Sequence, residues 1–293
     1  MKKAKSLVIL LGSLTLLSFF FSCESISDFD TLGRVVSSGI DAGMAIAKAA
    51  EPITPEQEYY IGRSVAATLL QSYDLADEVK LTAYLNKICM ALVIHSERPE
   101  LYNGYHVSIL DSDQINAFAT SGGHILITRG LLSCAENEDA LASVIAHEIG
   151  HIQLQHSLKA IKTSRSSQAA LATGGLFLNL TGNEDLMELA DMMDASINEV
   201  ITTMVNKGYS KQQEYDADAA AVKLLFDAGY NPHAIISMLK VLQEKQPRSS
   251  GGFAKTHPSA KQRIKEANKV LKKYATSPEA INRNKRFNET VFL

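Results

Sequence analysis

The stretch VIAHEIGHIQLQH, residues 144–156, places three histidines and one glutamate within ten positions. Upstream of it, Asn137 is a candidate N-cap, and Glu138 and Asp139 fall in what would be the first, electropositive turn of a helix. No proline interrupts the chain between Asn137 and His156. These features predict one helix that carries the histidines in its second half.

Two of these histidines are spaced to share one metal ion. His147 and His151 are four residues apart, so on a helix they lie about 40° from each other on one face, one turn apart. Glu148 lies beside them, where a carboxylate can stay off the metal and accept a proton from a water. The pattern H-E-x-x-H therefore predicts a zinc hydrolase site in which His147 and His151 are ligands and Glu148 is the catalytic base.

The third histidine of the stretch does not fit the same site. His156 follows His151 by five residues, about 140° around a helix, and so points elsewhere unless the helix ends between them. The longer zinc motif with a third histidine would require glycine at Leu154 and histidine at Ser157. We therefore expect His156 on the surface or beside a ligand, and a third ligand from elsewhere in the chain.

A second helix supplies that ligand. The segment SKQQEYDADAAAVKLLFDAGYNP, residues 210–232, begins with Ser210 as a candidate N-cap and reaches Gly229 as a stop signal. Glu214 and Asp218 lie on one face of it, and such a like-charge pair is unfavourable on an exposed helix. Facing a cation, the pair is favourable. We predict Glu214 as the third ligand to one Zn²⁺ per chain, and Asp218 as the partner that hydrogen-bonds a ligand histidine.

The composition limits the domain organisation and the class of partner. The chain has 293 residues, of which 46% are hydrophobic, enough for one substantial core. Its formal net charge is −3, and we expect no nucleic-acid partner. Residues 53–275 are predicted to form one metallopeptidase domain, followed by a polar tail, residues 276–293, without a role.

The N-terminus is predicted to direct export. MKKAKSLVILLGSLTLLSFFFSC, residues 1–23, has a basic start and a short apolar run typical of a secretory signal. We expect a lipoprotein signal peptide over residues 1–22, lipidation of Cys23, and a helical membrane tether over residues 23–52. Two alternatives to lipidation stay open: cleavage of this segment by an ordinary signal peptidase, or its retention as an uncleaved membrane anchor. In a diderm bacterium, glutamate rather than aspartate at position 24, directly after Cys23, is compatible with sorting of the lipoprotein to the periplasmic face of the outer membrane.

The other two cysteines leave one question open. Apart from Cys23 the chain has two cysteines, Cys89 and Cys134. Because the chain is expected to be exported, these two could form a disulfide. Their separation cannot be judged from sequence.

Five segments in a fixed order carry a resemblance to a known family: TPEQE, INAFATSGGHILITRGLL, VIAHEIGHIQLQH, EYDADAAAVKLL and THPSAKQRI. From about Thr54 to Tyr274 the chain resembles the zinc metalloendopeptidases of the CaaX prenyl protease and HtpX type. It is most like the exported lipoprotein members of the LoiP and BepA kind, but without helical repeats. The resemblance implies an α+β, predominantly helical zincin (gluzincin) fold with a small mixed β-sheet above the helix that carries H-E-x-x-H.

The resemblance also implies roles for further residues. Asn116 and Ala117 would belong to an edge strand that pairs with an extended substrate. His257 would occupy the fourth zinc position and hold the enzyme shut, or would stabilise the transition state. Arg263 would pair with Asp218 or with a substrate carbonyl, and the sequence does not choose between them.

The expected function is that of a lipid-anchored zinc metalloendopeptidase that hydrolyses unfolded or misassembled envelope proteins. The alternative is a chaperone-like, peptide-binding lipoprotein with an inactive or latent zinc site. The alternative predicts no cleavage even when His257 is removed.

Overall fold

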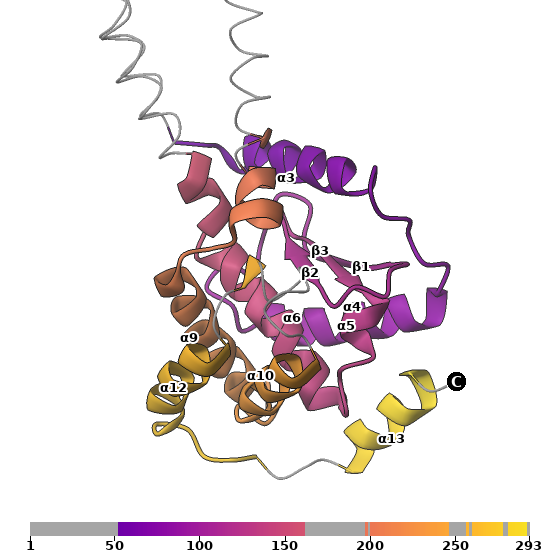
Figure 1. Cartoon of the computed structure of the whole chain (residues 1–293), viewed down its shortest axis with the longest axis vertical. Coiled ribbons are helices and arrows are strands. Elements are labelled where there is room, and N and C mark those ends of the chain that lie inside the picture. The colour runs from indigo at the N-terminus through magenta and orange to yellow at the C-terminus, as the bar shows by residue number, and fades with distance from the viewer. Residues whose placement is uncertain are drawn as a thin grey trace, which may run out of the picture. The chain divides into compact units, whose positions relative to one another are not determined.

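The computed structural model describes residues 52–161, 197–198, 200–245, 256–257, 260–277 and 281–291. Within these ranges, helices surround a small mixed sheet, which confirms the predicted α+β, predominantly helical class (Figure 1). The predicted signal peptide, the tether and Cys23 lie outside the described residues. Among the described helices, none combines the length and the apolar character that crossing a bilayer requires.

Along the described part of the chain, two helices come first, the three strands of the sheet follow, and the remaining helices come after the last strand. The strands are β1 (His106–Leu110), β2 (Ala117–Ala119) and β3 (His124–Thr128). The helices are α3 (Pro55–Leu69), α4 (Val79–Val93), α5 (Arg129–Leu132), α6 (Glu138–Gln153), α9 (Lys211–Asp227), α10 (Ala234–Lys245), α12 (Ala260–Leu271) and α13 (Ile281–Val291), with a π-helical segment η1 at Thr202–Lys207.

The sheet has the order β1-β3-β2, with β3 parallel to β1 and antiparallel to β2, so β2 is an edge strand. Side chains alternate between its two faces. Ile125 and Ile127 belong to the core that includes residues of α4 and α6, whereas Phe118 and Leu126 belong to a second core with residues of α3. The two cores cover both faces of the sheet, and β2 contacts α6 directly.

Helix α6 begins as the sequence predicts and ends before His156. The Asn137 side chain accepts a hydrogen bond from the amide of Ala140 at 2.8 Å, and Glu138 and Asp139 lie in the first turn. The helix ends at Gln153, and Gln155 has a positive φ of 54°. The chain thereby changes direction immediately before His156.

Helices α6 and α9 approach each other closely beside the predicted metal site. Helix α9 starts at the Ser210 capping box, as predicted. A Cβ atom added to Gly150 of α6 would lie 2.8 Å from the carbonyl oxygen of Ala217 in α9, closer than such atoms come in proteins. Only glycine leaves room for this contact, which brings Glu214 to the histidines of α6.

The C-terminal segment corrects one prediction. Residues 276–293 were expected to be a polar tail without a role, but Ile281–Val291 form α13, and the ring of Phe287 is buried in the main core. Arg286 Nε donates to Glu138 Oε2 at 2.6 Å, and Arg283 Nε lies 3.1 Å from Asp139 Oδ1. Because Phe287 is the only residue of α13 that is fully buried, with Val291 packed partly buried against the same core, the composition of the segment gives little sign of this docking.

The disulfide that the sequence leaves open is absent from the structure. Cys89 and Cys134 are both free and buried. Burial raises the pKa of the Cys89 thiol to about 12, so it behaves as a packed apolar side chain rather than a reactive thiolate.

Candidate metal centre

Four buried side chains from three parts of the chain meet at one point. They are His147 and His151 of α6, Glu214 of α9, and His257 in the segment before α12, and one potential ligand atom from each lies within 4.8 Å of the others. His147 Nε2 lies 3.0 Å from His151 Nε2 and 3.4 Å from His257 Nδ1. Glu214 Oε1 lies 3.0 Å from His257 Nδ1 and 3.4 Å from His151 Nε2.

These separations fit a tetrahedral zinc ion. Ligand atoms about 2.0–2.1 Å from such an ion lie about 3.3–3.4 Å from one another, close to the spacing observed here. Burial is the main cause that lowers the pKa of His147 and of His151, the latter to about 4, so both imidazoles are neutral donors. Burial alone would raise the pKa of Glu214, but His257 and Arg263 outweigh it and hold that pKa well below its usual value. The donor set is ready to bind a divalent metal.

Asp218 and Arg263 fix the orientation of the first histidine. Asp218 Oδ1 lies 3.0 Å from His147 Nδ1, which turns Nε2 of that ring toward the cluster. Arg263 donates to both oxygens of Asp218, at 2.9 and 2.6 Å, and its Nη1 lies 3.0 Å from Glu214 Oε2. Of the two partners considered for Arg263, the structure shows the pairing with Asp218.

His156 lies beside the second histidine and not on the surface. Only 1% of its surface is exposed, and its Nδ1 lies 2.9 Å from His151 Nδ1. Burial is the main cause that lowers the pKa of His156 to about 3, and the neighbouring His151 adds to it, so the neutral ring can accept a hydrogen bond from His151. The helix ends before His156 and the turn at Gln155 directs its ring back at the cluster, so of the two predicted positions the structure shows the one beside a ligand.

Glu148 is buried beside the four residues but makes no hydrogen bond through one of its oxygens. Its exposure is 1%, and within the described part of the chain Oε1 has no hydrogen-bond partner. Burial raises the pKa of the carboxyl above its usual value, which makes it a better proton acceptor near neutrality. A buried carboxylate oxygen without a partner is what a base for an incoming water requires.

The comparison with known proteins agrees with this geometry. The model of the family described as "Peptidase family M48" matches residues 80–271, more than half of the chain. The chain belongs to peptidase family M48. The match includes the four clustered residues together with Glu148, Asp218 and Arg263, and the resemblance seen in the sequence is confirmed.

Named relatives of the M48 chain come from bacteria and from mitochondria. The beta-barrel assembly-enhancing protease of Escherichia coli is 26% identical over 243 residues, which cover 81% of this chain and 49% of that protein. The mitochondrial metalloendopeptidase OMA1 of Schizosaccharomyces pombe is 26% identical over 200 residues, 65% of this chain and 53% of that protein. An HtpX protease homologue of Limosilactobacillus fermentum is 29% identical over 225 residues, which cover 62% of this chain and 70% of that protein. The chain thus spans about half the length of the first two relatives.

Tyr209 completes the surroundings of this M48 site, and sequence reasoning missed it. Its ring lies nearly parallel to that of His151, with centroids 4.2 Å apart and an interplanar angle of 20°. Its backbone amide donates to the carbonyl oxygen of Thr256 at 3.2 Å, next to His257. The residue precedes the capping box of α9, and no local pattern marks it as a neighbour of a metal ligand.

The predicted substrate-binding residues are occupied by contacts within the protein. Asn116 and Ala117 are 3% and 1% exposed. The backbone oxygen of Asn116 accepts from Thr128, and its Oδ1 accepts from the amide of Ala117 at 3.0 Å and from Thr256 Oγ1 at 3.4 Å. In this conformation the segment with Thr256 and His257 contacts both the start of the edge strand and the metal site.

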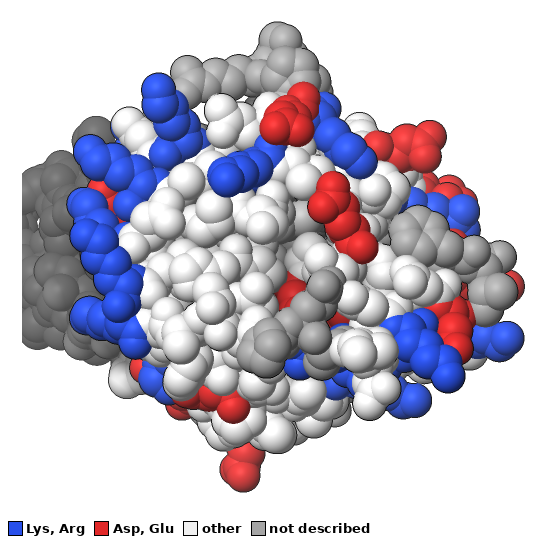
Figure 2. All heavy atoms as spheres, turned by 90° about the horizontal axis from the view of Figure 1, so that it is seen from below, with Lys and Arg blue, Asp and Glu red and all other residues white. Residues whose placement is uncertain are grey.

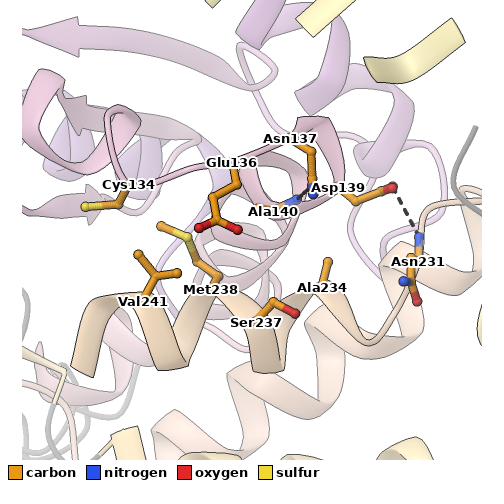
Figure 3. Close-up of a pocket in the computed structure, with 10 residues that line it drawn as sticks. All are labelled: Cys134, Glu136, Asn137, Asp139, Ala140, Asn231, Ala234, Ser237, Met238 and Val241. Atoms are coloured by element: carbon orange, nitrogen blue, oxygen red, sulfur yellow. Dashed lines mark hydrogen bonds between the residues drawn. The ribbon is translucent and has the colours of Figure 1, made fainter. Parts of the chain in front are cut away.

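A larger pocket of about 180 Å³ lies toward the other end of α6, between the first turn of α6 and α10 (Figure 3). Polar groups of Glu136, Asn137 and Asn231 line it together with Cys134 and Met238. The pocket contains no histidine to activate a nucleophile, and burial raises the pKa of the Cys134 thiol. Among the described residues that line this pocket, none pairs a nucleophile with a base, so the metal centre is the better candidate for a functional site.

Proposed function

We propose that this M48 chain is a zinc-dependent metalloendopeptidase, in a closed state, that acts on unfolded or misassembled proteins of the cell envelope. The observation that carries the proposal is the buried set of His147, His151 and Glu214 beside the unpaired carboxylate oxygen of Glu148. Nitrogen and carboxylate donors at these separations suit zinc.

Each residue of the site has a defined part in peptide hydrolysis. His147, His151 and Glu214 hold the metal, and Asp218 and His156 keep the two imidazoles oriented. When bound there, zinc lowers the pKa of a water and polarises the scissile carbonyl. Glu148 accepts the proton of the attacking water and passes it to the leaving amine. Arg263 neutralises the buried carboxylates of Asp218 and Glu214.

The closed state is supported by the position of His257. Its Nδ1 lies within 3.0–3.4 Å of Glu214 and His147, where the fourth ligand of a tetrahedral ion belongs. A catalytic zinc site needs that position for water or substrate. Thr256, which precedes it, contacts Asn116 at the edge strand. One movement of this segment would therefore free both the fourth ligand position and the Asn116 side chain at the start of the edge strand.

An extended polypeptide is the substrate class that the surroundings of the site support. A narrow apolar pocket beside His147 and Glu148 is lined by side chains of α6 and α10: Val144, Ile235, Met238, Leu239 and Leu242. Its volume of about 20 Å³ is room for about one water, so an apolar substrate side chain next to the scissile bond would enter it only if the pocket widens on opening. The face seen from below Figure 1 has a largely uncharged centre, and Lys and Arg lie around its margin together with Asp and Glu (Figure 2). Such a mixed surface favours a polypeptide over a nucleic acid.

The envelope location rests on the N-terminal sequence and on the name of a relative. The apolar run before Cys23 is typical of an exported lipoprotein, and the Escherichia coli relative is named for enhancing β-barrel assembly. We therefore place the chain on the periplasmic face of the outer membrane of a diderm host, anchored through Cys23. Labelling of expressing cells with an alkyne-bearing fatty acid tests this, since a Cys23→Ala variant must lose the label.

The test of the activity combines cleavage with metal analysis. The purified full chain in detergent is incubated with unfolded casein, and zinc is measured by mass spectrometry on the same sample. We expect about one zinc per chain, loss of cleavage with 1,10-phenanthroline and recovery with added zinc. Zinc binding without cleavage, by wild type and by the protein with His257 removed, would favour the peptide-binding alternative.

Replacing His257 with alanine is expected to increase cleavage of casein at least several-fold. The change removes the side chain that competes with water for the fourth position, while His147, His151 and Glu214 still bind zinc. Initial rates at equal zinc occupancy are compared with those of wild type. His95→Ala, a change of an exposed histidine, is the matched control and should leave the rate unchanged. A lower rate in the His257 variant would mean that this histidine serves the reaction.

A further inference from the structure

The hydroxyl of Tyr209 is a buried polar group for which the closed state provides no partner. The side chain is buried, and within the described residues its hydroxyl makes no hydrogen bond. Leaving such a group unsatisfied costs about 1–3 kcal/mol, so native structures keep few of them. The cost is understandable if the hydroxyl gains a partner in another state of the protein.

The place of Tyr209 points to the state in which that partner is present. Its ring covers the face of His151, and its centroid lies 6.3 Å from that of His257. Its amide donates to Thr256, in the segment that would move on opening. Tyr209 thus lies beside both His151, a predicted metal ligand, and His257, the residue that fills the substrate's position.

A tyrosine hydroxyl, with an ordinary pKa of about 10, carries its proton near neutrality and can donate a hydrogen bond. Burial, followed by the negative charges of Glu148 and Glu214, raises the pKa of the Tyr209 hydroxyl above its usual value. Those two carboxylates flank the reacting atoms of the proposed mechanism. The hydroxyl is therefore available as a hydrogen-bond donor beside the carboxylates of the proposed site.

We propose that Tyr209 is a catalytic residue, whose hydroxyl donates a hydrogen bond to the scissile carbonyl oxygen once His257 has left the metal. The inference rests on the proposed peptidase function and assigns a donor to it. No bond is made or broken at Tyr209. The hydroxyl stabilises negative charge that develops on the substrate, and this contribution is larger in the transition state than in the bound peptide.

The test removes the hydroxyl and keeps the ring. Tyr209→Phe is made in the full chain carrying His257→Ala, so that the closed state does not limit the rate. The experiment measures kcat and KM for a fluorogenic peptide, the zinc content, the melting temperature and the Ki of a phosphinic peptide that mimics the tetrahedral state. Tyr102→Phe, a change at a tyrosine that is 57% exposed, is the matched control.

The expected result is a fall in kcat on the order of 100-fold, as for other donors to a developing oxyanion, with little change in KM. The Ki of the phosphinic peptide should rise by a similar factor, while zinc content and melting temperature stay unchanged. An unchanged kcat and Ki would overturn the proposal, and so would a loss explained by weaker zinc binding, which would make Tyr209 a support for His151 only.

Failure of the proposed function is separable from failure of this inference. If the His257→Ala protein binds zinc but cleaves no peptide, the peptidase proposal fails. The phosphinic peptide still reports on Tyr209: weaker binding to the Phe variant supports the donor role, and equal binding overturns it.

Discussion

The change of Glu148 to glutamine is expected to lower kcat by about 10³-fold while zinc stays bound, because proton transfer by a placed base contributes about 10²–10⁴-fold. Glutamine has nearly the same shape and cannot accept the proton. The carboxylate lies beside the ligand cluster and is not one of its members, so the donors to the metal remain. Its Oε1 has no hydrogen-bond partner among the described residues, so the fold loses no contact there.

The measurement follows casein cleavage and zinc content on one preparation, in the His257→Ala background. Glu244→Gln, at an exposed position of α10, is the matched control and should leave both values unchanged. If the Glu148 variant retained a tenth or more of the wild-type kcat, the proton would be accepted elsewhere. If it lost zinc, Glu148 would be a ligand.

The change of Arg263 to methionine is expected to destabilise the zinc-free protein by about 3–5 kcal/mol, the usual effect of removing one partner from a buried ion pair. Arg263 is 2% exposed and pairs with the buried carboxylates of Asp218 and Glu214. Methionine retains much of the volume but leaves two negative charges close together in the interior. Zinc should offset part of this loss, because it brings positive charge to Glu214.

Urea unfolding, with and without one equivalent of zinc, measures this difference. The loss of stability should be clearly smaller in the zinc-loaded protein than in the zinc-free protein. Lys261→Met, at an exposed position of the same helix, controls for the loss of a cation and should change stability by less than about 0.5 kcal/mol. An equal loss with and without zinc would show that Arg263 acts through packing and not through charge.

The sequence predicts those parts of the centre that depend on regular helices. The four-residue spacings of His147 to His151 and of Glu214 to Asp218 hold on any straight helix, and the caps at Asn137 and Ser210 locate both helices. Which surfaces meet is less predictable. The contact of Gly150 with Ala217 uses small residues that occur in many helices for other reasons.

The features that the sequence leaves open, His156 and Arg263, and the one that it misses, Tyr209, depend on irregular backbone or on distant parts of the chain. His156 reaches His151 because Gln155 adopts a positive φ, a conformation that glutamine seldom takes. Tyr209 meets His151 across 58 residues of sequence, a separation that local patterns do not bridge. Arg263 had two candidate partners, and only the packing of α12 against α9 distinguishes them.

Helix α13 binds, within the same chain, to the domain that holds the metal centre, as a tethered peptide would. It lies outside residues 80–271, which the family model matches, yet Arg286 binds Glu138 at the start of the helix that carries H-E-x-x-H, and Phe287 is buried in the main core. Tethering gives such a segment a high effective concentration, so contacts too few for a free peptide are sufficient. The folded domain thus extends beyond the residues that the family model matches. A protein trimmed to residues 80–271 would lack Arg286, the arginine that pairs with the carboxylate of Glu138.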